Sequence, residues 1–335
     1  MLLCFLLLFF VSTVSSQAKF AVSGGRFQKN SDHSISFDWP GVRVSTIVSC
    51  PISVSSATLT LNVSSSLASG SSGSHTFLIN DATGGRGRAQ EFLFKAANVP
   101  TLIEVALNVS AKNTLVEMIK LTEALFGVFT VFGVEISNGC SFSSPPSLGG
   151  SNAGLGIAFI GDSLTCGYGS LGVSPCRFSF VLFFFFSFIL FLFLISSSFS
   201  SATEDVTSGY AGGLVESEAS TIGSHFSFVC WSGKGVVRNY NSEPGPTMSQ
   251  LWNLTLANDV NSAWNFSDSD YIQKVVVLLG ANDLSTPPRP SFETFSSGFN
   301  ALLTQIEIAY PKADLIVSCG PVDDFCYQDY QVGVK

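Results

Sequence analysis

The spacing of apolar residues changes part-way along this 335-residue chain, and that change constrains the fold more than any other feature. From residue 19 to about residue 136, apolar and polar residues alternate, most clearly in 35–39, 59–63, 77–79, 92–94, 103–109 and 128–136. Alternation with a period of two is typical of strands with one buried and one solvent-facing side. With Gly-rich turns such as 84–87 between the strands, residues 19–137 are predicted to form a β-sandwich of jelly-roll type.

The second half of the chain has short, continuous apolar runs instead, at 155–160, 226–229, 274–279 and 314–318. Such runs are typical of strands buried on both faces of a parallel sheet. Between the last two runs, apolar residues recur at helical spacing: Phe295, Phe299, Leu302, Leu303 and Ile306. Residues 155–335 are therefore predicted to form a three-layer α/β domain. The Pro-, Gly- and Ser-rich segment 138–154 is predicted to be an interdomain linker.

Two apolar segments are expected to lie outside these domains. Residues 1–16 are apolar and end in small residues, which predicts a secretory signal peptide and a secreted, extracellular protein. Residues 178–200 carry no charge and are long enough for a membrane span. They lack the Gly, Ala, Trp and Tyr common in membrane spans, which favours a translated intron. Both interpretations of 178–200 remain open, and membrane attachment is expected only if this segment is a genuine span.

Charge and cysteine content exclude some classes of partner. The 16 Lys and Arg residues against 24 Asp and Glu residues give a net charge of -8, which argues against nucleic-acid binding. No metal-ligand spacing occurs among the eight Cys residues, and with only three His residues we expect neither a metal nor another cofactor. Disulfides are expected in a secreted chain, although the sequence does not reveal their pairing. Four sequons are compatible with N-glycosylation: Asn62, Asn108, Asn253 and Asn265.

Polar motifs follow three of the predicted parallel strands. They are Gly-Asp-Ser-Leu-Thr-Cys-Gly-Tyr-Gly at 161–169, Trp-Ser-Gly-Lys-Gly at 231–235 and Gly-Ala-Asn-Asp at 280–283. Active sites of open α/β sheets lie at the carboxyl ends of the strands, so we expect these motifs to meet. A Ser on a tight turn, a Gly N–H and an Asn amide are the parts of a nucleophile with an oxyanion hole.

These motifs, together with Ala-Thr-Glu-Asp at 202–205 and the preceding sandwich, resemble the GDSL/SGNH hydrolase superfamily and, more narrowly, carbohydrate esterase family two. The resemblance covers residues 19–322 apart from the Phe-rich segment. It implies a serine esterase, similar to acetylxylan esterases, that removes O-acetyl groups from plant cell-wall polysaccharides such as xylan or mannan. The expected partner is an acetylated polysaccharide or oligosaccharide.

The resemblance also implies a role for individual residues. Ser163 would be the nucleophile, and the backbone N–H groups of Ser163 and Gly233 with the Asn282 amide would form the oxyanion hole. Asp162 and Asp283 would support the turns, and for Asp162 we prefer this structural role to a chemical one.

Two assignments stay open at the sequence level. Gly235 is the alternative to Gly233 as oxyanion donor. Aromatic residues near the motifs could stack on sugar rings, and we select Trp231 over Tyr168, Trp252 and Trp264, since Trp is also a common core residue.

The family's general base is a His in a C-terminal block, and this sequence has no His beyond His225. His225 begins a predicted strand, at the opposite end from the motifs, so no general base is identified. We expect the sequence to be truncated at its C-terminus, with a Ser that lacks its base. The alternative function is therefore a catalytically inactive carbohydrate-binding protein.

Overall fold

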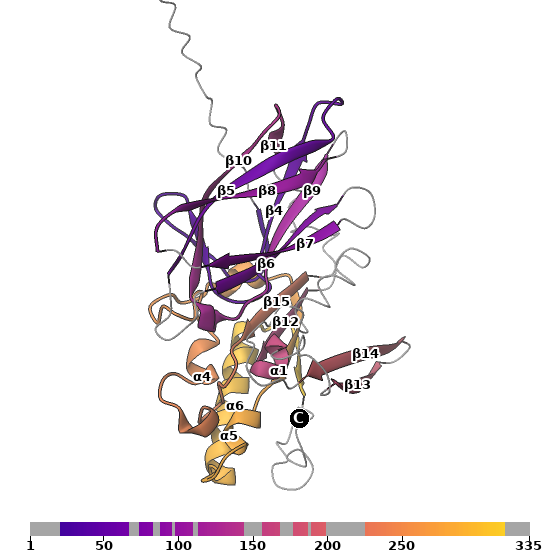
Figure 1. The fold of residues 1–335 in the computed structure, drawn as a ribbon. Coiled ribbons are helices and arrows are strands. Elements are labelled where there is room, and N and C mark those ends of the chain that lie inside the picture. The colour runs from indigo at the N-terminus through magenta and orange to yellow at the C-terminus, as the bar shows by residue number, and fades with distance from the viewer. Residues whose placement is uncertain are drawn as a thin grey trace, which may run out of the picture.

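The computed structural model describes residues 21–66, 74–82, 88–95, 98–109, 113–143, 156–167, 177–186, 189–198 and 225–318. The described chain forms an antiparallel β domain followed by an α/β domain, one above the other in Figure 1. The predicted signal segment 1–16, the 202–205 motif and Tyr168 lie outside the described residues.

The β domain is built from two antiparallel sheets. The first has the order β1-β4-β9-β6-β7, with β11 pairing with β4 along the same edge as β1, and the second has the order β2-β3-β10-β5-β8. The strands of the first sheet are β1 (Ala21–Gly24), β4 (Arg43–Ser49), β6 (Ser74–Ala82), β7 (Arg88–Lys95), β9 (Thr114–Lys120) and β11 (Ser141–Ser143). Those of the second are β2 (Gln28–Lys29), β3 (Ile35–Phe37), β5 (Ser56–Ser66), β8 (Thr101–Asn108) and β10 (Val128–Ile136).

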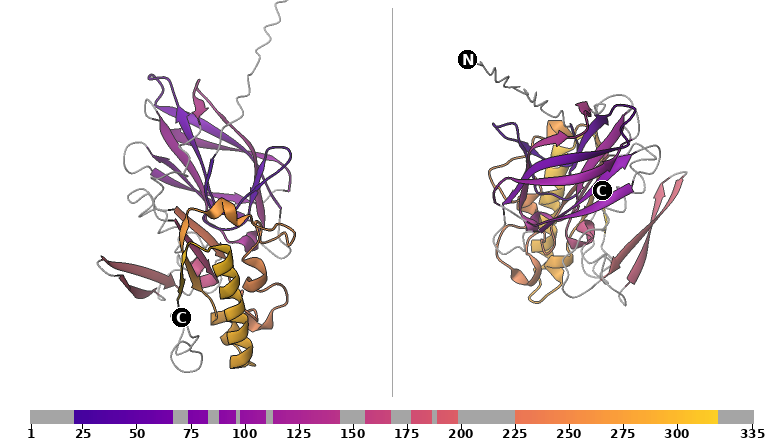
Figure 2. Two further views of the ribbon diagram at one scale, coloured as in Figure 1. Left: turned by 180° about the vertical axis from the view of Figure 1, so that it is seen from behind. Right: turned by 45° about the horizontal axis from the view of Figure 1, so that its top comes forward.

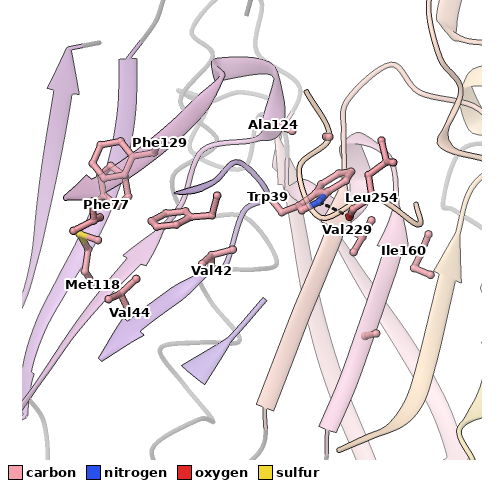
Figure 3. Packing of buried hydrophobic residues seen from close by; sticks show 14 of the residues in the cluster. Trp39, Val42, Val44, Phe77, Met118, Ala124, Phe129, Ile160, Val229 and Leu254 are labelled. Carbon is pink, nitrogen blue, oxygen red and sulfur yellow. Dashed lines mark hydrogen bonds between the residues drawn. The ribbon is translucent and has the colours of Figure 1, made fainter. Parts of the chain in front are cut away.

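The inner faces of the two sheets meet in an aromatic core. The ring centroid of Phe129 on β10 lies 4.4 Å from that of Phe77 on β6 and 5.5 Å from that of Phe94 on β7 (Figure 3). Along β5, buried residues alternate with more exposed ones over the whole strand, as the period of two predicts. The β4 strand was not predicted, because Val44, Ser45 and Thr46 are all buried and burial alternates only from Thr46 onward.

The sandwich extends into the predicted linker. The β11 strand pairs with β4, and Cys140 forms a disulfide with Cys50, with a Cα–Cα distance of 4.2 Å. The prediction of a linker over 138–154 is therefore wrong for 138–143, where strand pairing outweighs a turn-rich composition. Residues 144–154 lie outside the described residues.

The α/β domain contains a parallel sheet of order β15-β12-β16-β17. Its strands are β12 (Gly156–Gly161), β15 (His225–Cys230), β16 (Ile272–Leu278) and β17 (Asp314–Val317). Its α-helices are α1 (Ser163–Cys166), α4 (Met248–Leu251), α5 (Ala281–Leu284) and α6 (Phe292–Ala309). The four continuous apolar runs thus form the four strands of this sheet, as predicted.

The long helix α6 runs beside the sheet (Figure 2). Ser291 caps its N-terminus by accepting a hydrogen bond from the Thr294 N–H, and the helix ends before Pro311. Four of the five residues that the helical spacing selected are buried, namely Phe295, Phe299, Leu302 and Ile306. The fifth, Leu303, is only partly buried. The four buried residues pack in the same core as Ile160 of β12 and Val277 of β16.

A second apolar cluster includes residues of both domains. Phe159, Phe226 and Phe228 of the parallel sheet pack with Ile119 and Leu121 of the sandwich. In the described part of the chain, this second cluster, which also includes Cys166 of α1, therefore lies where sheet and sandwich meet.

Buried polar side chains of the sandwich bond directly to the α/β domain. The Asp38 carboxylate accepts hydrogen bonds from the backbone N–H groups of Ala257 at 3.0 Å and Asn258 at 2.9 Å. The Arg26 guanidinium donates to the Leu254 carbonyl at 2.8 Å, and the Trp39 indole donates to the same carbonyl at 3.3 Å (Figure 3). The two domains therefore share a continuous interface that fixes their relative position.

The Phe-rich segment forms two strands, β13 (Arg177–Phe186) and β14 (Ile189–Ser198). They pair antiparallel with each other and with no other strand in the described part of the chain. The described residues include no helix that is both long enough and apolar enough to span a membrane.

Candidate active site

The three predicted motifs meet at one edge of the parallel sheet. Gly161 at the end of β12 is in register with Cys230 at the end of β15 and with Leu278 at the end of β16. Because these three strands are parallel neighbours, the turns that follow them emerge side by side.

The first turn presents Ser163 at the start of the short helix α1. Asp162 caps this helix, since its carboxylate accepts the Leu164 N–H at 3.0 Å. A Cβ at Gly161 would lie 1.8 Å from the Thr165 hydroxyl, so only glycine lets the helix pack this tightly on β12. Ser163 is half-buried, and within the described residues its hydroxyl and its N–H have no hydrogen-bond partner. Both groups are therefore available to a substrate.

The second turn spans Trp231 to Lys234 and is called the oxyanion turn below. The Lys234 N–H donates to the Trp231 carbonyl at 3.3 Å, and Gly233 has a φ of 80°, which a turn of this kind requires at its third residue. No described residue accepts a hydrogen bond from the Gly233 N–H. The Gly235 N–H instead donates to the Asn239 side chain at 3.3 Å. Of the two glycines considered, Gly233 is thus the one with a free donor.

Trp231 and Lys234 also contact each other through their side chains. The Lys234 ammonium lies 4.9 Å from the centroid of the Trp231 ring, so one face of the indole is covered by this cation. The other two tryptophans near the motifs are structural. Trp252 is 2% exposed and packs on Phe266, and the Trp264 indole donates to Ser269 at 2.9 Å.

The third turn contributes Asn282 from α5. Its amide nitrogen donates to the Asp162 carboxylate at 3.1 Å and to the Lys234 carbonyl at 2.9 Å. An amide nitrogen has two hydrogens, and both are used here. Asn282 therefore joins the three turns, and a hydrogen bond from it to an oxyanion would require exchange of one of these contacts.

Asp283, the next residue, lies beneath the following loop. Its carboxylate accepts the N–H groups of Val236, Val237 and Arg238 at 2.8, 2.7 and 2.8 Å. Burial raises the pKa of Asp283, while these three hydrogen bonds act in the opposite direction. The geometry is that of a residue that shapes a loop.

The Asp162 carboxyl is the most perturbed acid of the site. Its side chain is 1% exposed, and burial raises its pKa to about 7, with a further contribution from the negative charges of Asp283 and Glu123. The hydrogen bond from the Leu164 N–H lowers the pKa of Asp162, but by less than burial raises it.

Two further connections were not found from the sequence. A disulfide joins Cys166 at the end of α1 to Cys230 at the end of β15, with a Cα–Cα distance of 5.6 Å. The Glu123 carboxylate, from the sandwich domain, accepts the Ser232 N–H at 2.5 Å and the Ser232 hydroxyl at 2.6 Å. Glu123 lies 109 positions from Ser232 and belongs to no motif, so no local signal in the sequence indicates it.

Comparison with known proteins agrees with this arrangement. No family model matches the chain. The cellulase/esterase CelE of Acetivibrio thermocellus is 28% identical over 204 residues, which cover 61% of this chain and 21% of CelE. A family two carbohydrate esterase from Clostridium thermocellum, solved with cellohexaose, superposes with a TM-score of 0.68 at 22% identity, over 91% of this chain and 79% of that one.

A family two carbohydrate esterase from Cellvibrio japonicus gives a TM-score of 0.69 at 19% identity, over 93% of this chain and 79% of that structure. This chain has the fold of the family two carbohydrate esterases. An acetyl xylan esterase, Est2A from Butyrivibrio proteoclasticus, shares the fold with a TM-score of 0.61 at 15% identity, over 92% of this chain and 80% of Est2A. The resemblance predicted from the motifs is thus confirmed, while the chain spans about a fifth of the length of CelE.

In this family two carbohydrate esterase fold, no described residue at the site supplies an imidazole. His225 pairs with Gly156 at the amino end of the sheet, opposite the site, while His33 and His75 belong to the sandwich. The described residues also contain no group of three or more His, Cys, Asp and Glu side chains arranged to hold a metal ion.

Proposed function

We propose that this chain belongs to a secreted serine esterase that removes O-acetyl groups from plant cell-wall polysaccharides such as xylan or mannan. The observation that carries the proposal is the free Ser163 hydroxyl beside two unpaired backbone donors, the N–H groups of Ser163 and Gly233. The comparisons with known proteins support the proposal. The relatives are named as carbohydrate esterases or, for CelE, as a cellulase/esterase; one was solved with cellohexaose and another is named an acetyl xylan esterase.

In this mechanism, the Ser163 oxygen attacks the acetyl carbonyl carbon, and the carbonyl oxygen becomes an oxyanion that accepts hydrogen bonds from the two free N–H groups. The sugar hydroxyl leaves, and water then hydrolyses the acyl-enzyme to give acetate. Each oxyanion donor contributes about 3 kcal/mol to lowering the barrier. The base that takes the Ser163 proton is not among the described residues.

Acetate release from acetylated xylo- and manno-oligosaccharides tests the proposal. Ser163→Ala should abolish release, whereas Ser296→Ala, which removes a Ser hydroxyl on the exposed side of α6, should leave it unchanged. Oligosaccharide binding measured by calorimetry on the same samples separates the alternatives. Binding without acetate release would support the catalytically inactive carbohydrate-binding protein, and neither binding nor release would refute both.

Two further proposals concern the apolar segments 1–16 and 178–200. We infer that residues 178–200 are a translated intron and that residues 1–16 direct secretion. Sequencing the transcript across codons 170–210 tests the first, since a spliced message that retains the segment would contradict it. Detergent-free fractionation of cells that express the chain tests secretion. Release into the soluble secreted fraction would support secretion, whereas retention in the membrane fraction would support a membrane span. We also propose that the sandwich is of jelly-roll type and that the α/β domain has three layers.

A further inference from the structure

We propose that Glu123 is a positioning residue through which the sandwich domain holds the oxyanion turn. Both oxygens of the Glu123 carboxylate are used on one residue, since one accepts the Ser232 N–H at 2.5 Å and the other accepts the Ser232 hydroxyl at 2.6 Å. Glu123 is 1% exposed, so these contacts are shielded from water. The inference deepens the proposed function, because it assigns a residue of the first domain to the site of the second.

Glu123 is itself held by a buried cation. The Lys120 ammonium donates to the carbonyls of Asp38 at 2.7 Å and Glu123 at 3.1 Å, and also to that of Thr122. Lys120 is fully buried. Glu123 is the N-cap of the short helix η1 (Ala124–Phe126), and its carbonyl also accepts the Phe126 N–H at 3.2 Å. The loop that carries the carboxylate is therefore fixed to the sandwich.

The contact acts on the residue that precedes the free donor. The direction of the Gly233 N–H is set by the peptide plane that joins Ser232 to Gly233, and Glu123 fixes Ser232 at two atoms. On the other side of this peptide, the Gly233 carbonyl accepts the Tyr240 N–H at 2.8 Å and the Lys234 carbonyl accepts the Asn282 amide at 2.9 Å. With both sides held, the Gly233 N–H is oriented before substrate arrives, which is the condition under which such a donor lowers a barrier.

Asp38 provides a matched control for a purely structural role. It is another fully buried carboxylate of the sandwich that accepts N–H groups of the α/β domain, but its partners are Ala257 and Asn258 rather than the oxyanion turn. A substitution at either position weakens the interface, whereas only one at Glu123 changes the turn.

The first experiment compares Glu123→Gln, Ser232→Ala and Asp38→Asn in the full chain, with acetate release measured below the melting temperature of each. Glu123→Gln should lower kcat about 10- to 100-fold with less than a threefold change in KM, which is less than the roughly 100- to 1000-fold cost of removing an oxyanion donor outright. Ser232→Ala, which removes only the hydroxyl contact, should lower kcat less. Asp38→Asn should lower the melting temperature without changing kcat. Equal kcat values in Glu123→Gln and Asp38→Asn would overturn the proposal.

A second measurement separates this proposal from the proposed function. If the parent chain releases no acetate, amide hydrogen exchange across residues 231–235 still reports whether Glu123 holds the turn. Exchange should rise at least 10-fold there in Glu123→Gln and stay unchanged in Asp38→Asn. Unchanged exchange in Glu123→Gln would overturn the positioning role, whatever the chain's activity.

Discussion

The Asn282 amide donates a hydrogen bond to the Asp162 carboxylate across 3.1 Å, with both side chains buried. Asp162 caps the helix that begins at Ser163, and the same amide also donates to the Lys234 carbonyl in the oxyanion turn. The relative position of nucleophile and oxyanion turn therefore depends on one amide group, on a carboxyl that is costly to ionise, and on the Cys166–Cys230 disulfide.

Substitution of Asn282 should weaken the fold as well as the site. Asn282→Ala removes the donor to the second oxygen of the Asp162 carboxylate, which keeps only the Leu164 N–H, and the donor to the Lys234 carbonyl. We expect a loss of about 1–3 kcal/mol in the free energy of unfolding. Asn282→Asp places a second carboxyl against Asp162, so its loss should be larger at pH 8 than at pH 5. Urea unfolding at the two pH values measures both effects. Asn261→Ala, at an exposed position, is the control, and an equal loss in the control would contradict the prediction.

The raised pKa of Asp162 predicts the direction of a pH effect on stability. Between the ordinary value of 3.8 and about 7, the folded protein keeps a proton that the unfolded chain releases. The free energy of unfolding therefore falls as the pH rises from about 4 to about 7, by up to about 1.4 kcal/mol per pH unit from this group. In Asp162→Asn, which cannot titrate, that part of the slope should disappear. Urea unfolding at half-unit pH steps tests this, and identical slopes in parent and variant would refute it.

The two disulfides among the described residues should differ in their effect on activity. They close loops with sequence separations of 64 residues for Cys166–Cys230 and 90 for Cys50–Cys140, so the loop-closure model gives each about 4 kcal/mol of stability. Only Cys166–Cys230 joins the nucleophile helix to the strand that precedes the oxyanion turn. The double Ser variant of this pair should lose most acetate release at a temperature where it is still folded, and that of Cys50–Cys140 should retain it. Equal losses of activity would show that both disulfides act through stability alone.

Arg26 should contribute more to stability than a typical arginine. Its guanidinium donates to the carbonyls of Leu254 and Trp252 across the domain interface and lies 5.4 Å from the centroid of the Phe266 ring. Arg26→Met removes charge-assisted donors from buried carbonyls, and we expect a loss of about 2–3 kcal/mol in the free energy of unfolding.

Lys312→Met serves as the control for Arg26→Met, since Lys312 pairs with Asp270 at 3.9 Å and both side chains are about three-quarters exposed. We expect this variant to lose about 1 kcal/mol or less. Urea unfolding of both variants measures the difference. A larger loss in Lys312→Met than in Arg26→Met would contradict the importance of the interface contact.

Sequence patterns alone located the four strands of the parallel sheet, several strands of the sandwich and the sheet edge that carries the three motifs. Alternation along β5 and the continuous apolar runs of β12, β15 and β16 follow from how many faces of each strand are buried, and this shows in the order of residues. The prediction that Ser163, Gly233 and Asn282 lie on neighbouring turns required only that parallel strands end at a common edge. The β4 strand and the pairing of β11 were missed, because burial and pairing there depend on partners distant in the chain.

The three-dimensional arrangement alone reveals which atoms of these turns are bonded within the described protein and which are not. It shows that the Gly235 N–H is bonded to Asn239, that no described residue accepts the Gly233 N–H, and that both amide hydrogens of Asn282 are used within the protein. It pairs Cys166 with Cys230 and brings Glu123 to Ser232 across the domain interface. Hydrogen bonds and disulfides depend on distances of a few ångströms in space, whereas local sequence patterns report only which faces of each segment are buried.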